Sequence, residues 1–301
     1  MQSAFALGVV NRAVLVTGST DGIGITTAKH LAKKGYDVLI HGRDSQRIEA
    51  AVKAVQAFGS QGNKVLPLPP ADLSTVQGCR RLVQQVEQLC DKENLALSII
   101  MNNAGVFAEK HVLTEDGLEL TFAVNVMAPF VITSLLLPRL LYESSTSKTT
   151  ASRIVIASSL SQCAAIRSWD DIHYRNRSYS AHAAYSESKL LDAMLTMEFA
   201  KRLPSQRITC NCLDPGTVNT KMLLAGWGRI GIEVEDALDE TWLCSSPQVE
   251  HVTGKYFVNQ QARRASSSAY DENERARMWN LLGEIAPDAA QVWEAQVTKA
   301  M

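Results

Sequence analysis

A tyrosine and a lysine stand four positions apart in the stretch HAAYSESKLLDAM, which runs from His182 to Met194. The stretch has the pattern of an amphipathic helix, so Tyr185 and Lys189 share one helical face, with about 5–6 Å between their Cβ atoms. A phenol has a pKa near 10, which must fall by roughly three units before the group can act as a base near neutral pH. A neighbouring ammonium favours the phenolate. The pair therefore fits general acid/base catalysis, although a plain surface pair has the same spacing.

Three glycines stand between a short β-branched run and a helical stretch in VLVTGSTDGIGITTAKHL. Gly18, Gly22 and Gly24 have the spacing G-x-x-x-G-x-G. Glycines in this setting permit a tight turn and let the backbone approach a pyrophosphate at the N-terminus of the following helix. An ordinary strand–helix turn can also contain glycines, but the strand–turn–helix context favours dinucleotide binding.

The end of the second predicted strand, LIHGRDS, indicates which dinucleotide is bound. An acidic residue there would contact the adenosine ribose 2′-hydroxyl, whereas an arginine accommodates a 2′-phosphate. The chain has Gly42 at that place and Arg43 immediately after it, and a planar guanidinium suits a phosphate. Asp44 is expected to cap the next helix or to pair with Arg47. We therefore expect NADP(H) as the cofactor.

The segments that must position these residues alternate between strands and helices. Short apolar runs predict strands at 13–18, 36–42, 64–73, 97–105, 153–160 and 207–216. Helices of 12 or more residues separate them, a pattern typical of βαβ units. The sequence predicts an α/β fold: a single-domain, doubly wound parallel sheet with helices on both faces, spanning residues 1–301. The polar run from Glu143 to Ser152 is expected to be a surface loop.

Composition excludes several other classes of protein. The 30 Lys and Arg residues against 31 Asp and Glu residues leave a net charge of −1, which gives no support for nucleic-acid binding. The six cysteines form no C-x-x-C pair, so we expect free thiols, a reducing compartment such as the cytoplasm, and no metal site. Cys210 and Cys212 are expected to pack on one face of a strand.

We expect no membrane span and no signal peptide. The most apolar run, MAPFVITSLLLPRLL, is interrupted by Pro129, Pro138 and Arg139 and is shorter than the roughly 20 residues that a span needs. The first 12 residues, MQSAFALGVVNR, lack a basic segment followed by a long apolar one.

Several motifs together resemble one family. TGSTDGIG, NNAG, Asn125, IASS, YSESK and DPGTVNT are similar, in this order and over nearly the whole chain, to those of short-chain dehydrogenases/reductases. The long stretch from Ser159 to Tyr185 and the tail GKYFVN…AYDENERARMW resemble the retinol-dehydrogenase-like and WW-domain-oxidoreductase-like branch. The chain departs from commoner family patterns at Ala157 and Asp214.

The resemblance implies roles for individual residues. Tyr185 would be the general acid/base, and Lys189 would lower its pKa and hold the nicotinamide ribose. Ser159 would bond the reacting oxygen, and Asn125 would support a water that links Lys189 to solvent. Asp72 would contact adenine, residues 103–105 would pass the adenosine ribose, and residues 215–220 would bind the carboxamide. The implied cofactor-binding set is Gly18, Ser19, Thr20, Asp21, Gly22, Ile23, Gly24, Arg43, Asp72, Leu73, Asn103, Ala104, Gly105, Tyr185, Lys189, Pro215, Gly216, Val218 and Thr220.

The resemblance also implies a substrate lid at about 217–246 and a helical tail at about 271–301, which could cap the fold or support a homo-oligomer. We expect an apolar carbonyl or alcohol substrate, because apolar side chains crowd the lid: Met222, Leu223, Leu224, Trp227, Ile230, Ile232, Val234, Leu238, Trp242 and Leu243. These side chains could instead pack on the sheet. Four arginines also leave room for an acidic substrate group: Arg167, Arg175, Arg177 and Arg229. His182 faces either the substrate or solvent.

Two other functions remain open from the sequence. One is a reductase of a tetrapyrrole double bond on the same scaffold, and the other is a non-catalytic NADP sensor.

Overall fold

The fold is built on one eight-stranded sheet. The computed structural model describes residues 12–146, 151–203 and 207–300, so the first 11 residues, for which no signal peptide is expected, lie outside it. The strand order is β3-β2-β1-β4-β5-β6-β7-β8, and all neighbours pair in parallel except β7 and β8. The strands are Arg12–Val16, Asp37–Ile40, Val65–Pro67, Ala96–Asn102, Ser152–Ala157, Ile208–Asp214, Tyr256–Val258 and Gln261–Arg263. The predicted doubly wound parallel sheet is confirmed.

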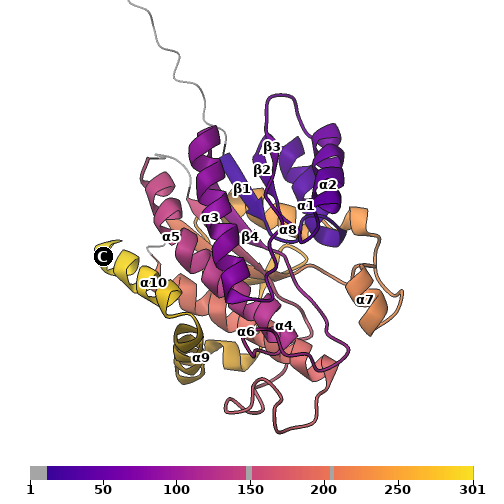
Figure 1. Ribbon diagram of the computed structural model, residues 1–301, viewed down its shortest axis with the longest axis vertical. Helices are drawn as coiled ribbons and strands as arrows, with labels where there is room; N and C mark the ends of the chain where they lie inside the picture. Colours follow the sequence, from indigo (N-terminus) through magenta and orange to yellow (C-terminus); the bar gives the residue numbers. More distant parts are fainter. Residues whose placement is uncertain (1–11, 147–150, 204–206, 301) are drawn as a thin grey trace, which may run out of the picture.

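Helices cover both faces of the sheet (Figure 1). One face carries α3 (Val76–Glu93), α5 (Ala128–Thr146) and α6 (Ala181–Arg202). The other carries α1 (Gly22–Lys33), α2 (Ser45–Phe58) and α8 (Asp239–Ser245). The chain moves from β1 outward to β3 and then returns to β4, so β1 and β4 flank the point at which the strand order reverses. Ligands of open α/β sheets bind at the carboxyl ends of such strands.

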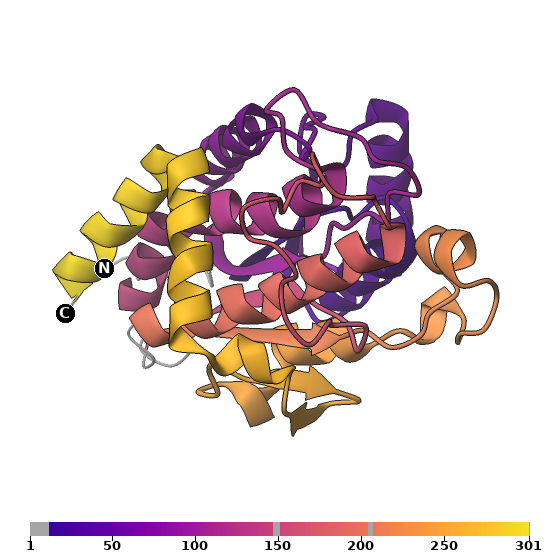
Figure 2. The same cartoon turned by 90° about the horizontal axis from the view of Figure 1, so that it is seen from below.

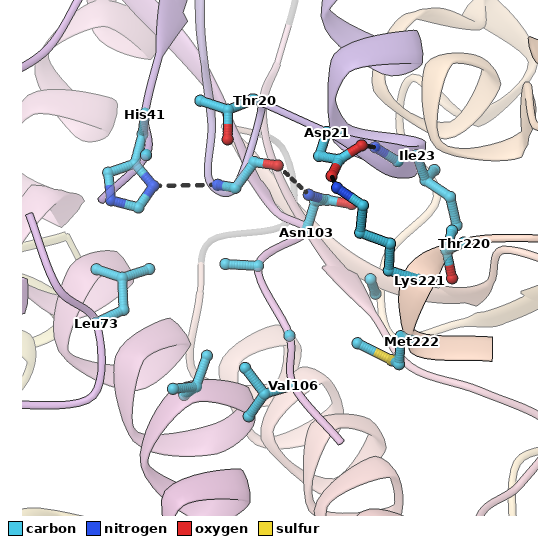
Figure 3. A pocket seen from close by; sticks show the side chains of 18 of the residues that line it. Thr20, Asp21, Ile23, His41, Leu73, Asn103, Val106, Thr220, Lys221 and Met222 are labelled. Atoms are coloured by element: carbon cyan, nitrogen blue, oxygen red, sulfur yellow. Dashed lines mark hydrogen bonds and ion pairs between the residues drawn. The ribbon is translucent and has the colours of Figure 1, made fainter. Parts of the chain in front are cut away.

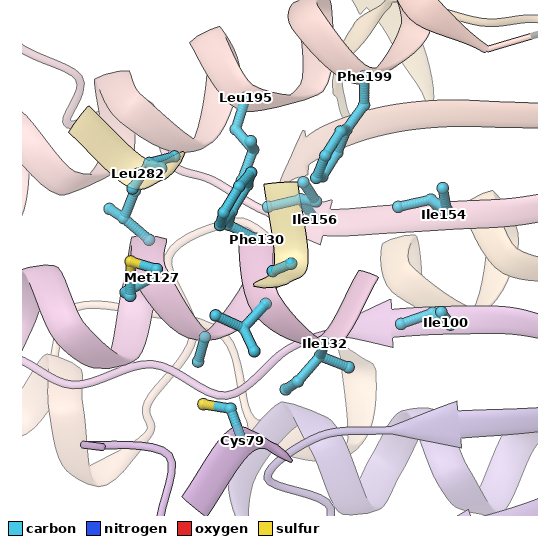
Figure 4. Close-up of a cluster of buried hydrophobic side chains, with 14 of the residues drawn as sticks. Cys79, Ile100, Met127, Phe130, Ile132, Ile154, Ile156, Leu195, Phe199 and Leu282 are labelled. Atoms are coloured by element: carbon cyan, nitrogen blue, oxygen red, sulfur yellow. The ribbon is translucent and has the colours of Figure 1, made fainter. Parts of the chain in front are cut away.

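The larger core lies between the sheet and α3, α5 and α6. Figure 4 shows Phe130 of α5 and Phe199 of α6 beside Ile154 and Ile156 of β5. Two further helices, α9 (Glu272–Ile285) and α10 (Pro287–Ala300), lie together on one side of the molecule, away from the short helix α7 (Lys221–Gly226) (Figure 2). Their buried side chains, Trp279 and Trp293, pack on Phe199 with ring centroids 5.8 and 4.4 Å away, so the tail caps the core.

The most apolar helix of the described residues is a core helix. Leu120–Ser145 is long and apolar enough to cross a membrane, but 89% of its most apolar 18-residue window is buried inside the protein. It includes the three-residue α4 (Leu120–Phe122), a π-helical turn (Ala123–Met127) and α5. The expectation that prolines interrupt this run is wrong, because Pro138 lies inside α5. A proline removes one backbone hydrogen bond, and burial on the sheet outweighs that loss here.

The structure differs from the sequence-based assignment in two other places. The run expected as a loop from Glu143 to Ser152 is helical through Thr146 and enters β5 at Ser152, while residues 147–150 lie outside the described part. Strands β7 and β8 were not predicted, because three residues are too few to show an alternating pattern. All six cysteines are free thiols, and Cys210 and Cys212 pack in the larger core as expected.

Candidate active site

A cavity of about 600 Å³ lies next to the carboxyl ends of β1 and β4. Figure 3 shows the glycine turn with Thr20, Asp21 and Ile23 on one side, and residues from the segment after β6 beside it. Most of the residues expected to bind the cofactor line this cavity: Gly18, Thr20, Asp21, Gly22, Ile23, Gly24, Arg43, Asp72, Leu73, Asn103, Ala104, Gly105, Tyr185, Lys189, Pro215 and Thr220.

Close packing explains the glycines of the turn between β1 and α1. Gly18 has φ +67°, a left-handed conformation that glycine adopts without strain. A Cβ atom on Gly24 would lie 2.4 Å from Nδ2 of Asn103 and 2.5 Å from the Gly18 carbonyl oxygen. Nδ2 of Asn103 in turn donates to the Thr17 carbonyl at 2.7 Å. The turn therefore stays flat against the loop after β4 and leaves the N-terminus of α1 open to the cavity, as a pyrophosphate requires.

A buried histidine, which the sequence reasoning missed, supports the turn. Nδ1 of His41 accepts from the Gly18 amide at 3.0 Å, and Nε2 lies 3.1 Å from the Ala71 carbonyl (Figure 3). Burial lowers the pKa of His41 to about 4, so the ring is neutral and Nε2–H donates to Ala71. Ser19 was expected to bind cofactor but does not line the cavity, because its buried hydroxyl accepts from the His41 amide.

The end of β2 has no room for an acidic side chain at Gly42. A Cβ atom on Gly42 would lie 2.6 Å from Cγ2 of Thr20 and 3.2 Å from Cγ1 of Ile48. The neighbouring Arg43 is exposed and lines the cavity. Asp44 caps α2 by accepting from the Arg47 amide at 2.8 Å, as expected.

An acidic side chain at the mouth of the cavity binds two basic ones. Asp21 caps α1, and its carboxylate lies 2.6 Å from Nζ of Lys221 and 2.9 Å from the guanidinium of Arg47. The hydrogen bond from Lys221 is the largest cause of the lowered pKa of Asp21. Neither base was assigned to the cofactor site from the sequence, although both line the cavity. The contact ties α7 to the glycine turn.

The tyrosine and lysine of α6 face this cavity from one helical face, as predicted. Nζ of Lys189 lies 5.6 Å from the Tyr185 ring centroid, and both side chains are buried. Burial raises the pKa of Tyr185, while Lys189 and a hydrogen bond from Ser159 only partly oppose this effect. Lys189 lowers the pKa of Tyr185, as expected, but desolvation of the phenolate outweighs the effect of the ammonium, so the net direction is upward.

The two serines at the end of β5 have different partners. Oγ of Ser158 donates to the Lys189 carbonyl at 2.8 Å and is buried, whereas Oγ of Ser159 accepts from the Ser161 amide at 3.0 Å. Asp214, a departure from the family pattern, accepts from the Leu160 amide at 2.9 Å and from the Gly216 amide at 3.0 Å. It therefore joins the Ser159 loop to the loop that follows β6.

Asn125 lies within the π-helical turn, and its whole amide is bonded to protein. Oδ1 accepts from the Val106 amide at 2.8 Å, while Nδ2 donates to the Val106 carbonyl and to Oγ of Ser188. The side chain thus clamps the segment after β4 to α6. A π-helical turn is frequent at functional sites.

This geometry agrees with comparisons with known proteins. A sequence profile described as short chain dehydrogenase matches residues 12–226. The chain belongs to this family. Retinol dehydrogenase 13 of Homo sapiens is 30% identical over 303 residues, which cover 94% of this chain and 88% of that protein. Polyprenol dehydrogenase of Mus musculus is 32% identical over 283 residues, which cover 89% and 82%.

Among solved structures, the Pseudomonas aeruginosa RhlG/NADP active-site complex is similar to this chain. The TM-score is 0.63 at 26% identity, with 83% of this chain and 95% of that chain covered. The sequence relatives indicate the retinol-dehydrogenase-like branch of the family. The chain is therefore an oxidoreductase with a nicotinamide cofactor and a small substrate.

The protein has a second cavity, of about 180 Å³. Tyr185 lines both this cavity and the first one. Ser159 and part of the expected lid line it, and so do Gly216 and Val218, which were expected to bind cofactor but do not line the first cavity. The lid residues are Met222, Leu223, Trp227 and Ile230.

A cluster of aromatic side chains lies beside Tyr185, the candidate catalytic residue. This cluster was not predicted from the sequence. The ring of Phe107 lies 5.8 Å from Tyr185, 4.9 Å from Trp227 and 5.1 Å from His182, measured between centroids. His182 is exposed at the start of α6, yet its ring also contacts Trp227 at 4.9 Å. The surface position of His182 is confirmed, and His182 lines neither cavity. The signal in the sequence was weak because Phe107 and Trp227 are far apart in the chain.

The C-terminal end of the expected lid, which lies in α8, belongs to the core. Trp242 packs edge-on against Phe257 with a centroid distance of 5.4 Å, and Leu243 is buried in the same cluster on the α1 face of the sheet. The expectation that Trp242 would contact substrate is therefore wrong. The helix α8 packs on α1 and the sheet, so only the segment before it remains free to cover a ligand.

Proposed function

We propose that the chain is an NADP(H)-dependent oxidoreductase that transfers a hydride between nicotinamide and the carbonyl or alcohol of an apolar, retinoid-, steroid- or fatty-aldehyde-like substrate. The observation that carries the proposal is the position of Tyr185. Its hydroxyl-bearing ring lines both cavities, with Lys189 in the wall of the larger and Ser159 in the wall of the smaller. A cofactor in one and a substrate in the other would meet at this ring.

Each residue of the proposed catalytic set has a separate role. The nicotinamide cofactor supplies or accepts the hydride. Tyr185 donates a proton to the substrate oxygen during reduction and removes it during oxidation. Ser159 donates a hydrogen bond to the oxygen on which charge develops, and Lys189 favours the phenolate and binds the nicotinamide ribose. Asn125 holds the segment after β4 and supports a water that links Lys189 to solvent.

The preference for NADP(H) is supported by the crowding at Gly42 and by the exposed guanidinium of Arg43. An acid that would bind a 2′-hydroxyl has no space at Gly42, while Arg43 lines the cavity. Asp72 and Leu73 line the cavity near the proposed adenine position, and residues 103–105 line the ribose side. The complex of RhlG with NADP supports the same cofactor class.

Arg43→Ala is expected to weaken NADPH binding by ten- to hundredfold and to leave the weaker NADH binding almost unchanged. A charge-assisted hydrogen bond contributes on the order of 1.5–3 kcal/mol, and NADH lacks the phosphate that would receive it. Titration of cofactor fluorescence with both nucleotides measures the two losses. Arg81→Ala serves as the matched control, since Arg81 is exposed on α3 and lines neither cavity. Equal losses for both nucleotides in the Arg43 variant would contradict the assignment.

An apolar substrate is supported by the walls of the smaller cavity and by the aromatic cluster. Leu223, Trp227 and Ile230 approach it from the segment after β6, which we propose is a lid over residues from about 217 to the start of α8. None of the four arginines considered for an acidic substrate group lines either cavity. Arg177 and Arg229 instead pair with Glu187 and Glu233. The named relatives act on retinol and polyprenol, which supports a long apolar body.

The catalytic efficiency should rise along a homologous series of aldehydes by roughly 0.8 kcal/mol for each buried CH₂ until the cavity is filled. Trp227→Ala should flatten this rise, because it removes an apolar wall beside Tyr185. Rates of NADPH oxidation over the series give the slope for each variant. Leu224→Ala is the control: Leu224 lies on α7 but is exposed and lines neither cavity, so the slope should persist. A flat series in the unmodified protein would rule out the apolar cavity.

A panel of retinoid, steroid, fatty aldehyde and small-ketone substrates tests the whole proposal. We expect NADPH oxidation with at least one of the long apolar carbonyls and much less with short ketones. NADPH binding without turnover of any member of the panel would contradict it.

A further inference from the structure

The ammonium of Lys189 lies in a buried ion pair that the roles described above do not use. Nζ of Lys189 is 2.8 Å from Oδ2 of Asp192, one helical turn further along α6, and 2.7 Å from the Ala157 carbonyl. The two side chains are 6% and 0% exposed. Oδ1 of Asp192 has no hydrogen-bond partner among the residues that the structure describes. Lys189 is therefore the only side-chain partner that the structure gives the Asp192 carboxylate among the described residues.

Among the described residues, no second acid lies in direct contact with the Lys189 ammonium. Tyr185 lies on the same helix, and the remaining titratable groups that face the ammonium come from β6 and α8: Cys212, Asp214 and Glu240. Oε2 of Glu240 accepts from the Thr27 hydroxyl at 2.8 Å. No contact shorter than 4.0 Å joins Lys189 to an acid other than Asp192 among the described residues.

Burial by itself would remove the charge of such a lysine. Burial lowers the pKa of Lys189, but Asp192, Tyr185 and Glu240 outweigh this effect, so the net direction is upward. Burial likewise raises the pKa of Asp192, to about 6, against the opposing effect of Lys189. The carboxylate is thus ionised at neutral pH, where the lysine needs its partner.

We propose that Asp192 is a positioning residue that keeps Lys189 charged and directed toward Tyr185 and the cofactor ribose. Two of the three donors of the ammonium are bonded to Asp192 and Ala157, which leaves the third for the cofactor. The inference rests on the proposed catalytic function, and it assigns to Asp192 a role that neither the tyrosine–lysine motif nor the family profile implies.

Asp192→Asn should lower the rate of carbonyl reduction at pH 7.5 at least about tenfold, the effect of one unit of pKa. The loss should shrink as the pH falls toward 6, because acid restores the ammonium, so the alkaline limb of the rate profile moves to lower pH. NADPH affinity, measured by fluorescence, should weaken with rising pH in this variant but not in the unmodified protein. Asp192→Glu retains a carboxylate and should return the profile toward that of the unmodified protein.

Glu198→Gln is the matched control. Glu198 is a buried acid on the same helix, and it pairs with Arg202 and Arg275 at 2.7 and 3.1 Å. Its loss should lower thermal stability and leave both pH profiles in place. A loss in Asp192→Asn that is equal at every pH would show a merely structural role and overturn the proposal. Faster alcohol oxidation by Asp192→Asn at neutral pH would also overturn the proposal. The Asp192 carboxylate would then weaken, rather than support, the effect of Lys189 on the Tyr185 phenol.

Failure of the proposed function and failure of the role of Asp192 give different experimental results. NADPH binding without turnover of any substrate by the unmodified protein would contradict the proposed function. The pH dependence of NADPH affinity in Asp192→Asn would still decide the inference, since a pH-independent affinity overturns it.

Discussion

Tyr185→Phe is expected to lower kcat by about 10²–10⁴-fold, the usual contribution of a general acid or base. The phenylalanine ring would keep the contacts with Phe107 and Trp227, whose centroids lie 5.8 and 5.4 Å away, so only the proton carrier is lost. NADPH affinity and the melting temperature should stay close to those of the unmodified protein. Steady-state rates in both directions, together with cofactor fluorescence, measure the separation.

Tyr179→Phe is the control for loss of a tyrosine hydroxyl near the site. Its hydroxyl donates to the Ala108 carbonyl at 2.7 Å and lies 3.2 Å from Glu119, so the variant should lose some stability but retain its rate. A Tyr185→Phe variant that keeps rates comparable to those of the unmodified protein would refute the mechanism.

The second large effect concerns stability at alkaline pH. Glu240 is buried, Oε2 accepts from Thr27, and Oε1 has no partner among the described residues. Burial raises the pKa of Glu240 to about 7. A carboxyl whose pKa is higher in the folded than in the unfolded state stabilises the fold at low pH, and this contribution is lost as the pH rises through 7.

Glu240→Gln removes this titration while it keeps the size of the side chain. The variant should exceed the unmodified protein in free energy of unfolding by about 3 kcal/mol at pH 8, and by less than about 1 kcal/mol at pH 5. Urea unfolding at the two pH values gives the difference directly. Glu272→Gln, at a carboxylate whose side chain is 71% exposed, should show no such dependence. Equal stabilities of the Glu240 variant and the unmodified protein at pH 8 would contradict the prediction, because they would mean that the carboxyl has the same pKa in the folded and in the unfolded protein.

The parts of the fold that could be predicted from the sequence are those with a long local pattern. The strands β1, β2, β4, β5 and β6 are buried apolar runs, and the helices between them are long enough to show a repeat. The pairing of Tyr185 with Lys189 was predictable for the same reason, because helix geometry places them on one face.

The rest depends on contacts between distant residues. His41 reads as a polar residue at a strand end, and its hydrogen bond to Gly18 follows only from the parallel pairing of β1 with β2. Glu240 bonds Thr27, which is 213 positions away. The raised pKa of Tyr185 was missed because a sequence shows the neighbouring ammonium but not the depth of burial.

Because Gly42 has no side chain, the order in which substitutions occur decides whether the cofactor preference can change. Because a Cβ atom there would lie 2.6 Å from Cγ2 of Thr20, Gly42→Asp made first would push the glycine turn away from the cofactor. Thr20→Ser made first would remove Cγ2, the atom closest to the new Cβ, so that only the 3.2 Å contact with Cγ1 of Ile48 would have to relax. The two positions are thus epistatic, and a lineage could move from a 2′-phosphate to a 2′-hydroxyl by one of the two routes and not by the other.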